Sequence, residues 1–397
     1  MSPKAVAPES PGATILASTK RVGGARRRVG AAARRAALAV LTGLAAFAAL
    51  QIMAAAALEL WAPGIIDPDY GARLQAIRAG RNTSTQRPAT IVMLGSSRAY
   101  YGFVTRELGA SLSEELGRPV RLVNAAQAGS GPVTELLTWK RLQRDGVRPH
   151  LLLVEVLPGL LSDAHARYEL SEARMPEQRL FCLDLPLIER YGAGARPDLW
   201  GRAACTRAAT LYERRLGILL TLAPSLLDPG TSTLVVGPEP GVLAADMPPE
   251  QRAKALEFAH LQYSEAVKHI DPDSRNGRAL CELLASCRET GVPAILVVMP
   301  EGPVFRSWYP PDAWPRIEGW LGRISREYDA PLVNALEWID EEDFMDSHHL
   351  FPRGADEFSR RLGRECLLPW LRRQPNRGDP PTGQPLGRTA VMREVGE

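Results

Sequence analysis

Short apolar runs recur along the middle of the chain, and several are bounded by proline or glycine. The runs are continuous rather than alternating, which is typical of strands buried on both faces of a sheet. Helical patterns separate them, for example at residues 104–116, 133–145 and 277–289. This succession predicts a parallel, doubly wound sheet with helices on both faces. The five expected strands are Thr90–Gly95, Val120–Asn124, His150–Leu157, Ala294–Met299 and Leu332–Asn334.

One interval interrupts this rhythm. More than a hundred residues separate the third strand from the fourth, and they contain helical patterns at 206–220 and 249–269 and a strand pattern at 232–236. Because the flanking strands belong to one sheet, we expect a mainly helical cap, inserted at about 160–275, instead of a separate domain. The predicted fold class is α/β, a flavodoxin-like doubly wound sheet that carries this cap.

The N-terminal region is basic and then apolar. No charged residue lies between Ala36 and Leu58, and a run of roughly 23 residues is long enough to cross a bilayer as a helix. Arginines directly precede the run. This predicts a single-pass protein of a bacterial inner membrane, with everything after about Trp61 in the periplasm. A buried alanine-rich helix and a signal peptide cleaved near 54–57 are the alternatives.

These patterns divide the chain into four regions. Residues 1–35 are expected to be a disordered, basic, cytoplasmic tail, and residues 36–60 a transmembrane helix. Residues 61–373 form the globular domain with its cap. Residues 374–397 are polar and rich in proline and glycine, so we expect a second disordered tail.

Composition and charge narrow the class of protein. Hydrophobic residues make up 45% and charged residues 23%, a normal balance for a globular protein. Eight basic residues and one acidic residue precede Ala36, so the tail carries +7 and the remainder −4 of the net charge of +3. Because the basic character belongs to the tail, it argues against a nucleic-acid-binding domain. Cys182 and Cys205 could form a disulfide, and no cysteine has metal-ligand spacing.

The tripeptide Gly95-Ser96-Ser97 ends the first strand and opens a helix. Doubly wound folds bind ligands at the carboxyl ends of their strands, so a hydroxyl on this turn is placed where a substrate binds. The start of the helix also provides backbone N–H groups for an anionic oxygen. Taken alone, a serine here is more often the N-cap of the helix than a catalytic group.

A second candidate element lies near the far end of the chain. Asp346 and His349 are three residues apart, just ahead of a helical pattern. A tight turn at that spacing can place the carboxylate against the imidazole, and a serine nucleophile needs such an oriented base. The alternative is an aspartate that caps the helix and a histidine on the surface. His348 is a competing base, but it lies only two residues from Asp346.

Three segments resemble, in order, sequence blocks of the SGNH/GDSL hydrolases. IVMLGSSR is similar to the first block, and DSHHLFPRGADEF is similar to the last. VNAAQAGSG is similar to the second block, in which an asparagine, here Asn124, precedes by five residues a glycine, here Gly129. The resemblance covers roughly 88–157 and 294–370, and it leaves out the cap and the N-terminal helix.

The resemblance implies a role for each matched residue. Ser97 would be the nucleophile, His349 the general base and Asp346 the group that orients it. The N–H groups of Ser97 and Gly129 would bind the oxyanion. Ser96 stands where the family usually has aspartate.

The third block departs from the family pattern. The family usually has an asparagine after the third strand, and its side chain is a third oxyanion donor. This chain has Leu157 there, followed by Pro158, and leucine cannot donate a hydrogen bond. The departure leaves the choice between hydrolysis and acyl transfer open.

A polar and aromatic loop follows the fourth strand. Glu301, Arg306, Trp308 and Tyr309 are expected at the same edge of the sheet as the serine, and with Asn124 they are candidate substrate-binding residues. Ordinary loop packing explains them equally well.

The sequence predicts a serine-dependent O-acyl ester hydrolase or O-acyltransferase that acts outside the cytoplasm on a cell-envelope glycan or lipid. The alternative is a catalytically silent binding or assembly subunit of an envelope polysaccharide system that keeps the fold. The bilayer is the expected partner of the N-terminal helix, and no cofactor, metal ion or nucleic acid is expected.

Overall fold

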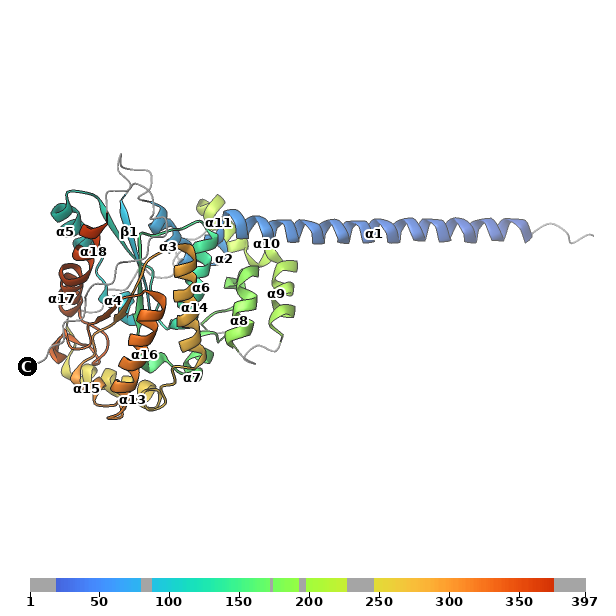
Figure 1. Cartoon of the computed structure of the whole chain (residues 1–397). Coiled ribbons are helices and arrows are strands. Elements are labelled where there is room, and N and C mark those ends of the chain that lie inside the picture. Colours follow the sequence, from blue (N-terminus) through green and yellow to red (C-terminus); the bar gives the residue numbers. More distant parts are fainter. Residues whose placement is uncertain (1–18, 80–87, 172–173, 193–197, 227–245, 375–397) are drawn as a thin grey trace, which may run out of the picture.

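The computed structural model describes residues 19–79, 88–171, 174–192, 198–226 and 246–374. An α/β domain forms the body of the protein, and one long helix projects from it (Figure 1). The strand pattern at 232–236 and most of the expected C-terminal tail lie outside the described residues.

A five-stranded sheet forms the centre of the domain. Its order is β2-β1-β3-β4-β5, and every neighbouring pair is parallel. This is the flavodoxin-like order expected for a doubly wound sheet, so the predicted fold class and all five predicted strands are confirmed. The strands are β1 (Ala89–Leu94), β2 (Val120–Asn124), β3 (Leu151–Val156), β4 (Ala294–Val298) and β5 (Leu332–Asn334).

Both faces of the sheet are buried. Because successive side chains of a strand point to opposite faces, Val92 and Leu94 join one apolar cluster whereas Ile91 and Met93 join the other. The central strands β3 and β4 alternate in the same way, which explains their unbroken apolar sequence. Parallel strands covered on both sides thus produce the pattern from which they were predicted.

Two sets of helices cover the two faces (Figure 1). The first face is covered by α3 (Pro68–Arg78), α6 (Pro132–Arg144), α14 (Arg275–Thr290) and α16 (Ala313–Tyr328). The second is covered by α4 (Ser97–Gly102), α5 (Arg106–Leu116), α17 (Pro352–Leu362), a π-helical turn at Gly363–Leu367, and α18 (Leu368–Arg373).

The segment between β3 and β4 is mainly helical, as expected for the cap, and its described residues contain no strand. The helical pattern at 206–220 is divided among three helices, because the chain leaves helical geometry at Ala209 and Arg214. Among the described residues of this segment, the helices before α14 are α7 (Asp163–Glu169), α8 (Leu185–Gly192), α9 (Leu199–Ala208), α10 (Thr210–Glu213), α11 (Arg215–Leu222) and α13 (Pro249–Lys268). Short 3-10 turns lie at Pro158–Leu160, Glu177–Arg179, Cys182–Asp184 and Pro224–Leu226.

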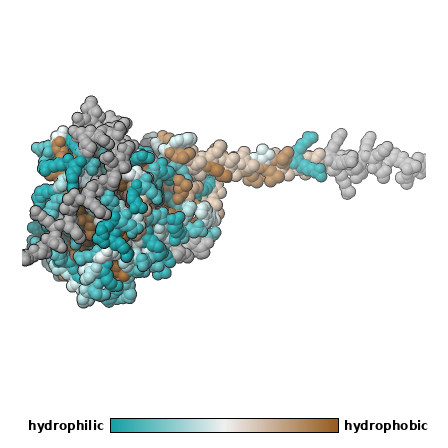
Figure 2. All heavy atoms as spheres, viewed as in Figure 1, coloured by the Kyte–Doolittle hydropathy of each residue, from teal (hydrophilic) through white to brown (hydrophobic). Residues whose placement is uncertain are grey.

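The projecting helix α1 spans Thr19–Trp61, and α2 (Pro63–Ile66) follows it. Within it, residues 31–61 are long and apolar enough to cross a membrane, and Figure 2 shows a largely apolar surface along α1 up to the domain. The helix begins earlier than expected, so part of the region predicted to be disordered is helical. All five cysteines are free, including Cys182 and Cys205.

A buried arginine ties three parts of the domain together. Arg141 of α6 contacts Asp67 and Asp184 with N–O distances of 2.7 Å each, and all three side chains are nearly inaccessible to solvent. Asp67 caps α3, and Asp184 belongs to the segment after β3. Burial opposes the charge of Arg141, but the two carboxylates raise its pKa above the ordinary value. The cluster therefore depends on all its members being present.

Replacing Arg141 with leucine should leave Asp67 and Asp184 buried without a cationic partner. We expect the free energy of unfolding to fall by about 3–5 kcal/mol, measured by denaturant unfolding of the full chain in detergent micelles. Arg360→Leu is the control, because the exposed Arg360 pairs only with Glu357 of its own helix and should change stability by less than about 1 kcal/mol. Equal losses in the two variants would contradict the role of the cluster.

Candidate active site

The candidate nucleophile lies at the topological switch point of the sheet. The strand order reverses at β1, which has β2 on one side and β3 on the other, and doubly wound folds bind ligands in the crevice at this point. Ser97 is the first residue of α4, directly after β1. Ser96 is the N-cap, and its hydroxyl oxygen accepts a hydrogen bond from the N–H of Arg98 at 3.3 Å. Capping by Ser96 leaves the hydroxyl of Ser97 available for other contacts.

The structure brings Ser97, His349 and Asp346 into one hydrogen-bonded chain. The Oγ atom of Ser97 lies 2.8 Å from Nε2 of His349, and Nδ1 of His349 lies 2.8 Å from Oδ2 of Asp346. Asp346 is buried, whereas Ser97 and His349 are partly exposed. A partly exposed hydroxyl and a buried orienting carboxylate suit a nucleophile that is activated by an imidazole.

The turn between Asp346 and His349 fixes the carboxylate. Its Oδ1 atom accepts the N–H of His349 at 2.8 Å, and Ser347 takes a left-handed backbone conformation with φ of 65°. Burial opposes ionisation of Asp346, but charge interactions and hydrogen bonds with His348 and His349 lower its pKa far below the usual range. The carboxylate is therefore ionised over the physiological pH range.

The competing base, His348, points into the protein. Its ring is buried, and it packs against Tyr263 and Phe305 with centroid distances of 4.9 and 5.2 Å. Burial lowers the pKa of His348 to about 4, so the ring is neutral at pH 7. Its Nδ1 atom lies 3.1 Å from Oδ1 of Asp346, so it supports the carboxylate.

Asp346 and the two histidines after it could also be considered as ligands of a metal ion. They are the group of possible metal ligands found within the described part of the chain. Ligand atoms of Asp346, His348 and His349 all lie within 4.8 Å of one another. Both ring nitrogens of His349 already contact Asp346 and Ser97, however. That leaves too few donors for a zinc site, which takes three or four protein ligands.

The two backbone donors expected for an oxyanion lie on the turns after β1 and β2. The N–H of Ser97 is at the first position of α4, where helical N–H groups have no partner within the helix. Gly129 has φ of 75°, a conformation that favours glycine. Gln127 donates its N–H to the carbonyl oxygen of Gly95 at 2.9 Å, which connects the two turns. Leu157, at the end of β3, is buried and apolar.

An arginine from the segment after β3 lies against Gly129. A Cβ atom added to Gly129 would lie 2.8 Å from Nη1 of Arg174, so the guanidinium group is in close contact with this turn. Arg174 also donates a hydrogen bond to the hydroxyl of Tyr168 and lies over its ring. The sequence did not predict this contact, because no local pattern connects Arg174 to a glycine after another strand.

Asn124 uses its side chain on the protein itself. Its Nδ2 atom donates to the carbonyl oxygens of Ala99, Tyr100 and Phe103 at 2.8–3.2 Å, and its Oδ1 atom accepts the N–H of Ala126 at 3.1 Å. These bonds hold the end of α4 against β2. The structure therefore gives Asn124 a positioning contact with α4, and its contact with substrate stays a prediction.

The loop after β4 divides into buried and exposed residues. Glu301 is fully buried and contacts Arg98 at 3.1 Å, and the hydroxyl of the buried Tyr309 donates to it at 3.1 Å. Both side chains lie inside the protein and not on an open binding surface. Arg306, in α15 (Pro303–Arg306), pairs with Glu337 near the surface.

Trp308, on the same loop, is half-buried. Its ring packs against Phe305 and His260 with centroid distances of 4.8 and 4.9 Å. Arg306 and Trp308 are thus the predicted residues of this loop that keep access to solvent.

A buried carboxylate supports the turn that carries the serine. Glu155 of β3 accepts hydrogen bonds from the N–H of Ser96 at 2.5 Å and from its hydroxyl at 3.0 Å. Two more buried carboxyls lie nearby, and burial raises the pKa of Glu169 to about 7 and of Glu135 well above its ordinary value. The sequence reasoning missed Glu155, although a single acidic residue in an apolar strand was a visible signal.

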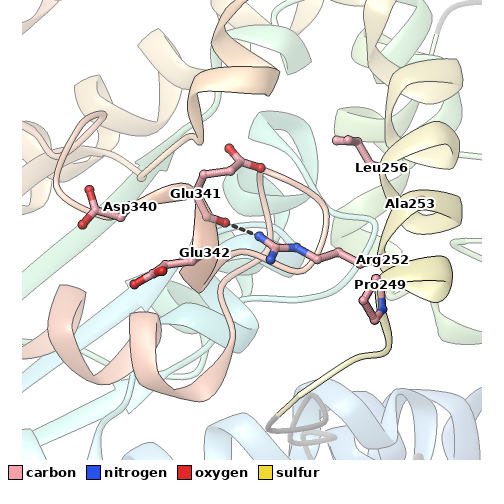
Figure 3. A pocket seen from close by; sticks show the side chains of 7 residues that line it. All are labelled: Pro249, Arg252, Ala253, Leu256, Asp340, Glu341 and Glu342. Atoms are coloured by element: carbon pink, nitrogen blue, oxygen red, sulfur yellow. Dashed lines mark hydrogen bonds between the residues drawn. The ribbon is translucent and has the colours of Figure 1, made fainter.

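An open hollow is lined in part by residues that shortly precede the turn from Asp346 to His349. It is lined by α13 and by the 3-10 turn at Glu341–Asp343, and Arg252 donates across it to the carbonyl oxygen of Glu341 (Figure 3). The carboxylate of Glu341 accepts the hydroxyl of Ser347 at 2.8 Å. The hollow is thus connected, through one hydrogen bond, to the turn that holds Asp346 and His349.

No family model matches the chain, and no curated protein matches it in sequence. Among solved structures, it is similar to the crystal structure of AlinE4, which is described as an SGNH-hydrolase family esterase. The match has 14% sequence identity and a TM-score of 0.28, and it covers 71% of this chain and 96% of the other. This similarity is too low to assign a reaction, so the reaction is inferred from the positions of the side chains at Ser97, Asp346 and His349.

Replacing His348 with asparagine should reduce acid destabilisation of the fold. The folded pKa of about 4 is below the ordinary 6.5, so stability from the neutral ring is present above about pH 6.5 and is lost as the pH falls toward 4. About 2 kcal/mol of this loss falls between pH 6.5 and pH 4.5, and an asparagine amide can replace Nδ1 without titrating. Denaturant unfolding at pH 6.5 and 4.5 measures it. An unchanged difference between the two pH values would show that His348 is not buried and neutral.

Proposed function

We propose that the chain is a serine-dependent ester hydrolase or O-acyltransferase. The observation that carries this proposal is the continuous hydrogen-bonded chain from the Ser97 hydroxyl through His349 to Asp346, with 2.8 Å at each step. Its position at the switch point of the sheet, with Ser97 and His349 partly exposed, supports access by a substrate.

The arrangement supports a two-step acyl transfer. Ser97 Oγ attacks the carbonyl carbon of an ester while its proton moves to Nε2 of His349, and Asp346 stabilises the imidazolium that forms. The tetrahedral intermediate collapses when the bond to the leaving alcohol breaks and His349 returns the proton to that alcohol oxygen. The acyl group then remains on Ser97. A water molecule, or an acceptor hydroxyl, loses a proton to His349 and attacks the acyl carbon. The bond between that carbon and Ser97 Oγ then breaks, and His349 returns the proton to Oγ, which restores Ser97 and releases the acid or the new ester.

Three groups are available to stabilise the oxyanion. The N–H groups of Ser97 and Gly129 are the backbone donors, and Leu157 contributes no donor. The guanidinium group of Arg174, in contact with Gly129, brings a positive charge to the same turn. We propose that Arg174 supplies the charge-assisted contact for the oxyanion or for an anionic group of the substrate.

The candidate membrane span in α1 supports a proposal about the location of the substrate. With α1 in a bacterial inner membrane and its arginines in the cytoplasm, the domain would lie in the periplasm, near envelope glycans and lipids. We therefore propose an acylated or acyl-accepting hydroxyl of a cell-envelope glycan or lipid as the substrate.

The full chain should react covalently with a fluorophosphonate probe at Ser97, and it should hydrolyse an activated acetyl ester. Because triad members act as a unit, Ser97→Ala and His349→Ala should each remove nearly all activity, roughly a thousandfold or more. Ser96→Ala should be much milder, because it keeps the nucleophile and the backbone N–H that Glu155 accepts, although it loses the hydroxyl contacts with Glu155 and with the N–H of Arg98. Absence of labelling in the folded wild type would favour a silent binding subunit.

Replacing Arg174 with glutamine should slow ester turnover by about a hundred- to a thousandfold if the guanidinium group contacts the oxyanion. Arg167→Gln is the matched control, since Arg167 is an exposed arginine at the start of the same segment. Turnover and fluorophosphonate labelling are measured together. If turnover of Arg174→Gln equals that of the control, the third contact lies elsewhere and the triad assignment is unaffected.

A further inference from the structure

The last part of α1 does not project freely but packs against the domain. Gln51 is buried, and its Oε1 atom accepts the N–H of Leu211 at 2.9 Å. Glu59 accepts the N–H of Cys182 at 3.0 Å and pairs with Arg207 at 3.0 Å. The helix is thus docked on α9 and α10 from Gln51 onward.

Docking leaves a short free span. The uncharged and undocked part of α1, Ala36–Leu50, has 15 residues, and a rise of 1.5 Å per residue makes it about 22 Å long. The hydrocarbon core of a bilayer is about 30 Å thick. A bilayer that covers this helix must therefore extend past Leu50, to the level at which α1 contacts the domain.

The docked part of α1 keeps an apolar face that the domain does not cover. Ile52 and Met53 are each 63% exposed, and Ala56 and Leu60 are exposed further along the helix. These positions continue one side of the helix at intervals of about one turn. An exposed apolar stripe that continues a candidate membrane span is suited to contact with lipid.

The outer surface of α9 and α10 is also exposed and largely apolar. We define the α9–α10 face as Trp200, Ala204, Ala208, Leu211 and Tyr212, all of which are exposed. The first three are spaced by four residues and so lie on one side of α9. Figure 1 shows α9 and α10 at the end of the domain from which α1 emerges.

The chemistry of this face suits the polar boundary of a bilayer. Tryptophan and tyrosine are enriched at that level, and Arg215 lies 4.0 Å above the ring of Tyr212. Residues 199–215 contain four arginines and one glutamate, an excess of positive charge that favours anionic headgroups.

We propose that the α9–α10 face and the exposed side of Gln51–Trp61 lie in the headgroup region of the bilayer that α1 crosses. The partner is a phospholipid surface that contains anionic lipid. The domain then rests on the membrane at one defined face, and this contact is independent of the chemistry at Ser97.

Photocrosslinking of the full chain in nanodiscs of zwitterionic and anionic phospholipid tests the proposal. The photoreactive residue p-benzoylphenylalanine is placed at Ala204 or Ala208 in separate variants, and phospholipid adducts are counted by mass spectrometry. We expect several-fold more adducts than at Leu261, which is 74% exposed. Leu261 belongs to α13, a helix that lies away from α1 in Figure 1. Leu261 controls for exposure and apolar character.

Phe47, in the free part of α1, is the positive control for the span itself. Adducts at Phe47 but no excess at Ala204 and Ala208 would overturn the proposal and leave the anchor intact. No adducts at any position would overturn the span as well. Adducts between two protein chains at Ala204 would show that a second copy, and not lipid, covers this face.

Discussion

The turn between β1 and α4 is stabilised by hydrogen bonds to the carboxylate of Glu155, on the central strand β3. Glu155 accepts both the backbone N–H and the hydroxyl of Ser96, and the next residues, Ser97 and Arg98, take their positions from this contact. Arg98 in turn is buried against Glu301 after β4. Breaking a buried pair of this kind typically costs about 3–5 kcal/mol, because the remaining charge has no partner. The candidate nucleophile, Ser97, is therefore positioned by contacts with β3 and with the loop after β4.

Buried histidines and a buried glutamate make the stability of the fold depend on pH in opposite directions. Burial lowers the pKa of His165 and of His348 to about 4, so the stability that depends on their neutral rings declines below about pH 6.5. Burial raises the pKa of Glu169 to about 7, so the stability from its protonated form is present below about pH 4.5 and is lost as the pH rises through 7. Between about pH 4.5 and pH 6.5 the two effects on the free energy of unfolding therefore oppose each other and partly cancel.

Local pattern was enough to predict the strands, because each is a continuous apolar run whose burial depends only on its own residues. Local pattern also marked Ser97, Asp346 and His349 as candidates, since each lies on a turn at a strand or helix end, but only the resemblance to the SGNH/GDSL blocks gave them roles. The contacts of Asn124, Glu301 and Arg174 were not predictable in this way. Each depends on a partner that is not a neighbour in the sequence, as the separation of 203 positions from Arg98 to Glu301 illustrates. The contact of Gln51 with the domain was not predictable for the same reason, because its partner, Leu211, belongs to α10.

Only Ala62 separates α1 from α2, and only Asp67 separates α2 from α3. A chain that passes from helix to helix through single residues has no flexible tether, unlike proteins joined to their anchor by long glycine- or serine-rich linkers. With α1 in a bilayer, the domain would be free to diffuse within the plane and to turn about the helix axis, but not to change its height. An acyl group would then be accessible only at one elevation above the lipid surface. The height of the site above the bilayer, in addition to recognition by its side chains, would thus determine which envelope molecules can react.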